Sequence, residues 1–179
     1  MEMREQRQDD LPGIEHLMDA AFGPRRGDRA VWRLRPGPPV PELCLVAEDN
    51  GVLVGSLRFW QVQIFDRPQL LLGPLAVQPE LRGKGHGKAL VWHGLAIASQ
   101  GSWDFCIISG EPDYYPRFGF VPVPAGQLVW PGFLEPGRLQ IKPLKSAEMP
   151  PLPPGPAAIL PDHGPPLAVR PASPLQETA

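Results

Sequence analysis

The segment at residues 81–90 (LRGKGHGKAL) has the residue types of a phosphate-binding loop. Glycines alternate there with basic side chains, directly before an apolar run of helical composition. Backbone N–H groups at a helix N-terminus favour an anion, and glycine lets a ligand approach the backbone closely. We therefore predict a phosphate site whose side-chain charge comes from Arg82, Lys84 and Lys88.

The spacing of the glycines excludes two common phosphate-binding motifs. A nucleotide-hydrolysing P-loop needs four residues between its glycines and a Ser or Thr after the lysine. Here Gly83 and Gly87 are one residue too close, and Ala89 stands at the hydroxyl position. A dinucleotide-binding G-x-G-x-x-G/A motif fails because its third position holds Leu90 or Lys88. The loop is therefore expected to hold a different phosphate compound.

Three strands should precede this loop. Residues 42–65 (ELCLVAEDNGVLVGSLRFWQVQIF) predict a strand, an Asn50-Gly51 hairpin turn and a longer strand. Residues 69–78 (QLLLGPLAVQ) predict a third strand, which contains Gly73 and Pro74. Because proline cannot donate to a sheet ladder, two interpretations stay open. This is either an edge strand, or a strand with a bulge that frees backbone groups and splays it from its neighbour.

Helices are expected before and after these strands. The first amphipathic helix is expected to start at Asp9, Asp10 and Pro12 and to end near Gly23. The apolar residues 89–98 predict another helix, packed on the sheet, and Gly94 would permit a close approach to a strand. Further elements follow in order: a strand at 103–109, a short helix between 111 and 119, and strands within 120–123 and 137–144. This order predicts an α/β fold (a mixed α+β sheet) with helices on its faces.

Several arginines follow the first helix and are predicted to lie on a short second helix that stops before Pro36: Arg25, Arg26, Arg29, Arg33 and Arg35. The simpler interpretation is a solvated face. In the alternative interpretation they attract an acidic acceptor.

Composition narrows the class of protein. The net charge of −2 argues against binding to nucleic acid or to an anionic membrane, and no apolar run reaches the ~20 residues of a membrane helix. Cys44 and Cys106 each lie in an apolar run, which indicates buried thiols in a reducing compartment rather than a disulfide or zinc site. The polar first residues predict no signal peptide. We expect a cytoplasmic protein.

The prolines are unevenly placed along the chain. Ten of the 26 lie between Pro150 and Pro174. Such a segment cannot form a second core, so we predict one domain at residues 1–145. A proline-rich extension at 146–179 would be extended or packed on that domain.

Three motifs in order then carry a family resemblance. Arg82-x-x-Gly85-x-Gly87 follows a strand of the form L-G-P-L-A-V at residues 72–77, and Y-x-x-x-G-F occurs at residues 115–120. Together with the helix pattern at 9–23, these resemble the GNAT superfamily of acyl-CoA N-acyltransferases, in its bacterial branch of predicted N-acetyltransferases. The resemblance covers roughly residues 1–145 and leaves the proline-rich extension outside.

The resemblance implies a fold and a donor. The GNAT fold has a central, mostly antiparallel sheet, splayed at the acyl-CoA cleft, with helices on both faces. Acetyl-CoA would be the donor cosubstrate, without a metal. Its pantetheine arm would pair with Leu75 and Val77, and the backbone N–H of Leu75 would polarise the thioester carbonyl. The implied pyrophosphate contacts come from the loop: Arg82, Gly83, Lys84, Gly85, Gly87 and Lys88.

The resemblance also implies a chemistry, in which a neutral amine attacks the thioester directly in a ternary complex. Tyr115 matches the tyrosine that protonates the CoA thiolate, while Tyr114 is expected in the core or the cleft wall. The general base is open between Glu111 and Asp113, with Glu111 placed first, although Glu111 also suits a helix cap.

The acceptor would be a small-molecule or protein amine. A second hypothesis is a non-catalytic acyl-CoA-binding or interaction module that uses the same cleft. A third is that the proline-rich tail completes a homodimer.

Overall fold

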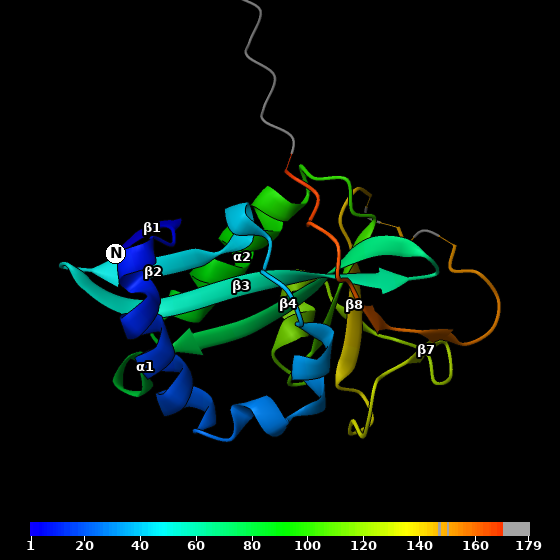
Figure 1. Cartoon of the computed structure of the whole chain (residues 1–179), viewed down its shortest axis with the longest axis horizontal. Helices are drawn as coiled ribbons and strands as arrows, with labels where there is room; N and C mark the ends of the chain where they lie inside the picture. Colours follow the sequence, from blue (N-terminus) through cyan, green and yellow to red (C-terminus); the bar gives the residue numbers. More distant parts are fainter. Residues whose placement is uncertain (147, 150, 170–179) are drawn as a thin grey trace, which may run out of the picture.

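An eight-stranded sheet organises the computed structural model, which describes residues 1–146, 148–149 and 151–169 (Figure 1). The strands run in the order β1-β2-β3-β4-β5-β8-β6, and β10 pairs with β3. All pairings in this sheet are antiparallel except β4 with β5. The strands are β1 (Glu2–Glu5), β2 (Leu45–Asp49), β3 (Val52–Ile64), β4 (Arg67–Val77), β5 (Phe105–Ser109), β6 (Val121–Pro122), β8 (Leu139–Pro143) and β10 (Leu160–Pro161). The predicted mixed sheet and its Asn50-Gly51 hairpin are confirmed.

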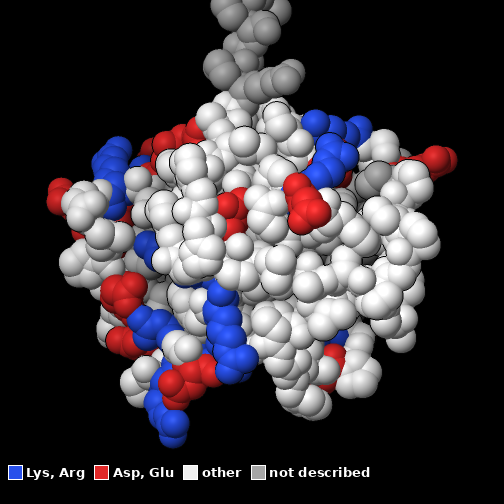
Figure 2. Space-filling view, turned by 45° about the vertical axis from the view of Figure 1, so that its right-hand side comes forward, with Lys and Arg blue, Asp and Glu red and all other residues white. Residues whose placement is uncertain are grey.

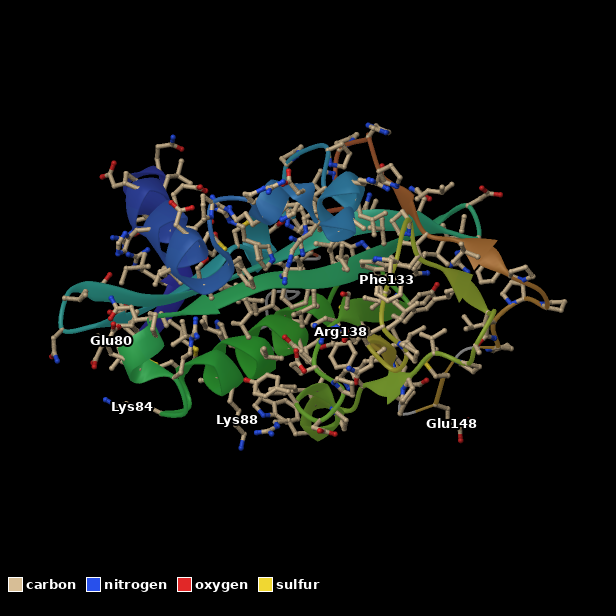
Figure 3. All side chains as sticks on the ribbon, turned by 90° about the horizontal axis from the view of Figure 1, so that it is seen from below. Glu80, Lys84, Lys88, Phe133, Arg138 and Glu148 are labelled. Carbon is tan, nitrogen blue, oxygen red and sulfur yellow. The ribbon has the colours of Figure 1, made fainter. Side chains whose placement is uncertain are left out.

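Helices cover both faces of the sheet. Helix α1 (Leu11–Phe22) and two 3-10 turns (Arg26–Asp28 and Ala30–Leu34) lie on one face, and α2 (His86–Ala98) lies on the other (Figure 3). Ile14, Leu17 and Met18 of α1 pack on β2 and β4, whereas the buried side of α2 joins a core with β3. A single second helix was predicted for residues 25–35 (the arginine segment). That prediction is wrong, because the chain makes two short 3-10 turns there.

Gly94 lets α2 settle closely onto β3. A Cβ atom at this position would lie 2.7 Å from an edge carbon of the buried Phe59 ring. No real Cβ makes so short a contact, so any larger residue would push the helix away from the sheet. The close approach predicted for Gly94 is confirmed.

Strand β4 diverges from β5 in the middle of the sheet. The two are paired only at Leu70 with Cys106 and at Leu71 with Ile107. On its other side β4 pairs with β3, and there the single residue Arg58 of β3 lies opposite two residues of β4, Gly73 and Pro74. This two-against-one count is a β-bulge. The bulge interpretation is therefore confirmed, and the edge-strand interpretation is wrong because β4 lies between two strands.

Part of the proline-rich tail packs on the sheet. Strand β2 pairs with the first half of β3, and β10 pairs with Val62 and Gln63 beyond it. Strand β9 (Ala157–Ala158) pairs in parallel with β7 (Leu128–Val129) in a separate two-stranded sheet. Ile159, between the two tail strands, is buried. The tail thereby covers the edge of β3 that β2 leaves open.

The surface shows no large region of a single charge on the face seen in Figure 2. Lysine and arginine side chains lie there among aspartate and glutamate, with a broad uncharged area beside them. Among the described residues, no helix is both long and apolar enough to cross a bilayer.

An arginine fastens β1 to the start of α1. Arg4 donates to both carboxylate oxygens of Asp10 at 2.7 and 2.9 Å and to Glu48 of β2 at 2.8 Å. The hydrogen bonds from Arg4 lower the pKa of Asp10 below its ordinary value. Asp10 thus stabilises the fold above its unfolded pKa of about 4, and this stabilisation is lost as the pH falls through its lower folded pKa.

We predict that Asp10→Asn lowers the free energy of unfolding at pH 7 by about 1–3 kcal/mol. The difference in the free energy of unfolding between this variant and the wild type should shrink toward pH 2–3, where Asp10 is protonated in both the folded and the unfolded protein. Urea unfolding at both pH values measures this. Asp9→Asn is the control, because Asp9 is exposed. An equal loss at both pH values would contradict the assignment.

Candidate functional site

Two hollows meet at the point where β4 leaves β5. The loop pocket has a volume of about 480 Å³ and lies between the end of β4 and residues 81–88. The bulge cavity has a volume of about 710 Å³ and lies beside Gly73 and Pro74. Both are lined by Ala21, Phe22, Leu75 and Tyr114. A long ligand entering at the loop can therefore reach the bulge by passing Leu75.

Backbone geometry at the loop pocket depends on glycine. Gly83 and Gly85 have positive φ values of 80° and 94°, and Gly85 is the N-cap of α2. Side chains rarely adopt this conformation, so glycine is required for the loop to turn directly into the helix. Gly87 has a different role. A Cβ atom there would lie 3.5 Å from the Tyr114 hydroxyl and 3.4 Å from Val77.

The structure brings most of the predicted cofactor-binding residues together. The loop pocket is lined by Leu75, Val77, Arg82, Gly83, Gly85, Gly87 and Lys88. Lys84 does not line it, and Figure 3 shows the Lys84 and Lys88 side chains pointing outward from the loop and the first turn of α2. The pocket thus offers backbone groups at a helix N-terminus and the arginine of the motif, an arrangement suited to a pyrophosphate.

The bulge cavity is larger and has aromatic walls. Trp32 and Trp130 line it together with Phe133, which is 84% exposed. Arg33 donates to the backbone carbonyl of Pro131 at 3.1 Å, which joins the arginine segment to the Trp130 loop. The cavity floor is formed by β4 and the end of β5. The bulge cavity therefore has room for a molecule beyond the end of the loop pocket.

Tyr115 lies deep in the bulge cavity. The residue is 8% exposed, and its ring packs edge-on against Tyr114 and Phe120. Burial, together with the neighbouring Tyr114 and Glu111, raises the pKa of Tyr115 well above its ordinary value. The hydroxyl therefore stays protonated far into the alkaline range. It is also a weaker acid than the free phenol near ~10 that sequence reasoning assumes.

Tyr114 lies in the wall shared by the two hollows. Its hydroxyl faces the first turn of α2, and the Arg117 guanidinium stacks 4.7 Å from its ring centroid. Burial raises the pKa of Tyr114, although the positive charge of Arg117 opposes the shift. The predicted place in the cleft wall is confirmed. Tyr114 is nevertheless a second phenol beside the site, which the motif alone does not single out.

The two proposed base residues have different surroundings. Glu111 lines the bulge cavity and accepts a hydrogen bond from Arg138 at 2.8 Å. Its side chain is 71% exposed, so the pair lies at the cavity rim. Asp113 is exposed and lines neither hollow. Glu135, on the loop after Trp130, is a cavity carboxylate that sequence reasoning missed, because its loop has no periodic pattern.

The structure separates the arginines that the sequence groups together. Arg25 is exposed beside Asp28, and Arg26 binds Glu15 and Asp19 of α1. Arg26, Arg29 and Arg35 line the bulge cavity. Sequence reasoning raised a binding role for the group but had no signal that singles out one member.

Neither cysteine belongs to the site. Cys44 and Cys106 are buried, free, and absent from the lining of both hollows. Burial raises the pKa of Cys44 to about 11, so its thiol stays neutral. In the part of the chain that the structure describes, no group of three or more His, Cys, Asp or Glu side chains could hold a metal ion.

Comparison with known proteins agrees with this geometry. The sequence matches the Acetyltransferase (GNAT) family over residues 11–107. The uncharacterized N-acetyltransferase YhbS of Escherichia coli K12 is 29% identical over 113 residues, which cover 62% of this chain and 68% of YhbS.

Two solved structures extend the likeness to the fold. A 1.55 Å crystal structure of YhbS from Escherichia coli in complex with CoA superposes with a TM-score of 0.73 and 26% identity, covering 94% of this chain and 95% of that one. A GNAT family acetyltransferase from Brucella melitensis, in complex with acetyl-CoA, gives a TM-score of 0.64 and 26% identity over 88% of this chain and 94% of that one.

Gly73 is the residue on which the bulge depends. Its φ is +120°, and a Cβ atom there would lie 3.0 Å from Nη2 of Arg35. We predict that Gly73→Ala lowers the free energy of unfolding by about 1–3 kcal/mol, because alanine does not tolerate this backbone conformation. Thermal and urea unfolding measure the change.

Gly13→Ala is the matched control, because Gly13 lies in α1 without a positive φ and has room for a methyl group. That change should be neutral or stabilise by about 0.5 kcal/mol. Equal effects of the two substitutions would show that the bulge does not need glycine.

Proposed function

The chain belongs to the acetyltransferase (GNAT) family, and we propose that it transfers an acetyl group from acetyl-CoA to a primary amine of a small molecule or a protein. The observation that carries this proposal is the meeting of the loop pocket and the bulge cavity at Leu75, beside the buried Tyr115. The first hollow suits the donor and the second suits the acceptor.

In this proposal the donor lies along β4. The amides of residues 83–87 bind the pyrophosphate at the positive end of α2, and Arg82 and Lys88 add charge. The backbone of Lys84 contributes as well, while its side chain stays in solvent. The pantetheine arm pairs with the backbone of Leu75 and Val77, which the divergence of β4 from β5 leaves without a strand partner on that side. The thioester then stands at the junction of the hollows.

The acetyl transfer proceeds by direct attack. The nitrogen lone pair of the neutral amine attacks the thioester carbonyl carbon, and the Leu75 N–H stabilises the resulting oxyanion. The C–S bond then breaks and the C–N bond remains, so the products are an acetamide and the CoA thiolate. Neither buried cysteine takes part, which agrees with a ternary complex and no covalent enzyme intermediate.

Tyr115 is proposed to protonate the departing thiolate. Its raised pKa ensures that the hydroxyl carries the proton at neutral pH. Burial at the cavity also disfavours the free thiolate, which makes the sulfur a stronger base than in water. The proton released by the attacking amine goes to Glu111 at the cavity rim, directly or through water. The ion pair with Arg138 holds that carboxylate in place.

The competing hypothesis is an acyl-CoA-binding module without catalysis. Both hypotheses require donor binding, but only the enzyme transfers labelled acetyl to an amine. We predict that acetyl-CoA binds and raises the melting temperature, and that Gly87→Val weakens binding by about 10- to 100-fold. A valine there would fill the space between Val77 and the Tyr114 hydroxyl.

Calorimetric titration with acetyl-CoA measures this, with Gly37→Val as the control because Gly37 has open space around it. Folded protein without affinity for millimolar acetyl-CoA would reject both hypotheses. Binding without transfer to any amine in a broad panel would favour the non-catalytic module.

The two adjacent tyrosines provide a test of the acid. We predict that Tyr115→Phe lowers kcat by about 100-fold or more while the affinity for CoA stays within about threefold. Tyr114→Phe should keep most of the turnover. Because the pKa of Tyr115 is raised, kcat of the wild type should not fall between pH 8 and 10. A larger loss with Tyr114→Phe than with Tyr115→Phe would move the acid role to Tyr114.

A further inference from the structure

Arg35 is a partly buried cation that the acetyl-transfer chemistry does not use. It follows the 3-10 turn Ala30–Leu34 and lines the bulge cavity. Within the described residues, its Nε atom is buried without a hydrogen-bond partner. Burial lowers the pKa of Arg35 to about 9, and no carboxylate offsets that effect. The group still carries its charge at pH 7.

Other charged residues around the cavity are better compensated. Arg26 is bound by two carboxylates of α1, and Arg138 is paired with Glu111 at the rim. Arg29 lies on the exposed side, 5.9 Å from the ring centroid of Phe22. Arg35 is thus the cavity cation that combines a buried Nε atom with the lack of a protein partner in the described residues. A buried charge without a partner is costly, so its persistence suggests that a ligand supplies the partner.

The Arg35 guanidinium is held in a fixed position. It stacks on the indole of Trp32 with 4.7 Å between Cζ and the ring centroid. Nη2 lies 3.0 Å from the place that a Cβ of Gly73 would occupy. The guanidinium therefore lies over the bulge at Gly73, which precedes Leu75 by two residues. An anionic group bound to Arg35 would lie close to the place where the thioester is proposed to stand.

We propose that Arg35 binds a carboxylate of the acceptor, so that the enzyme acetylates small amines that also carry an acid group, such as amino acids. This inference rests on the proposed acetyl transfer. A guanidinium presents a planar fork of N–H donors that matches a carboxylate, and stacking on an indole leaves its edge free to donate. One uncompensated cation matches one negative charge. The carboxylate would hold the acceptor while its amine faces Leu75.

Matched acceptor pairs test the proposal. β-Alanine and 4-aminobutyrate are each compared with the corresponding amide, which keeps the amine and removes the negative charge. With the wild type, kcat/KM should favour the acids by about 10- to 100-fold. With Arg35→Met this ratio should fall to about 1, while the affinity for acetyl-CoA is unchanged. Arg35→Lys, which keeps the charge but loses the fork, should fall between the two.

Arg25→Met is the matched control, because Arg25 is 90% exposed and lines neither hollow. It should keep the wild-type preference. Melting temperatures of all variants show whether Arg35→Met is folded, and Arg35→Lys carries the test if it is not.

Three results would overturn the inference. One is a wild-type enzyme that binds acetyl-CoA and acetylates acids and amides equally. Another is an acid preference that survives in Arg35→Met and Arg35→Lys. A third is that substitution of Arg35 changes only the preference between two donors, succinyl-CoA and acetyl-CoA, and not the preference between acceptors. Arg35 would then bind a carboxylate of the acyl group. Failure to bind acetyl-CoA would instead reject the proposed function itself, so the two failures are distinguishable.

Discussion

The divergence of β4 from β5 is the feature on which the rest of the site depends. The two strands pair at only two positions, Leu70 and Leu71 of β4, and the bulge at Gly73 and Pro74 begins one residue beyond them. A continuous ladder would have joined the backbone groups of β4 to β5 and closed the sheet. Because it stops, both hollows open onto Leu75, and a ligand can pair with the free side of β4.

The surrounding elements maintain that opening from both faces. Helix α2 packs closely on β3 through Gly94, which fixes its N-terminus and the glycine loop beside the end of β4. On the other face, α1 and the arginine segment form the roof of the bulge cavity. The tail strand β9 pairs with β7, next to Trp130 of the cavity wall. The tail thereby supports a wall of the bulge cavity, and whether it forms a separate unit from residue 146 remains a prediction.

Local sequence patterns predicted the parts of the site that depend on backbone conformation. Asn50-Gly51 specified the hairpin, and the glycine spacing specified a loop that turns directly into α2, because these features need particular φ values at particular positions. Gly73-Pro74 was compatible with an edge or a bulge. Only the pairing of β4 on both sides decides between them, and on the β5 side this pairing joins residues more than 30 positions apart.

Side chains brought together by tertiary packing were less predictable. Arg25 and Arg35 belong to one arginine-rich segment, yet one lies in solvent and the other beside Gly73. Nothing in the local pattern distinguishes them, because burial is decided by Trp32 and by the distant strand β4. Likewise, the motif identified Tyr115 but not how strongly its surroundings would raise its pKa. Glu135 was missed because it lies on an irregular loop.

The most direct test of the account is a crystal structure of this protein with CoA. The pyrophosphate is expected to lie on the amides of residues 83–87, and the pantetheine arm is expected to follow Leu75 and Val77. The sulfur should then end within hydrogen-bond reach of the Tyr115 hydroxyl. CoA bound away from the free side of β4, or a sulfur atom that does not reach the junction at Leu75, would contradict it.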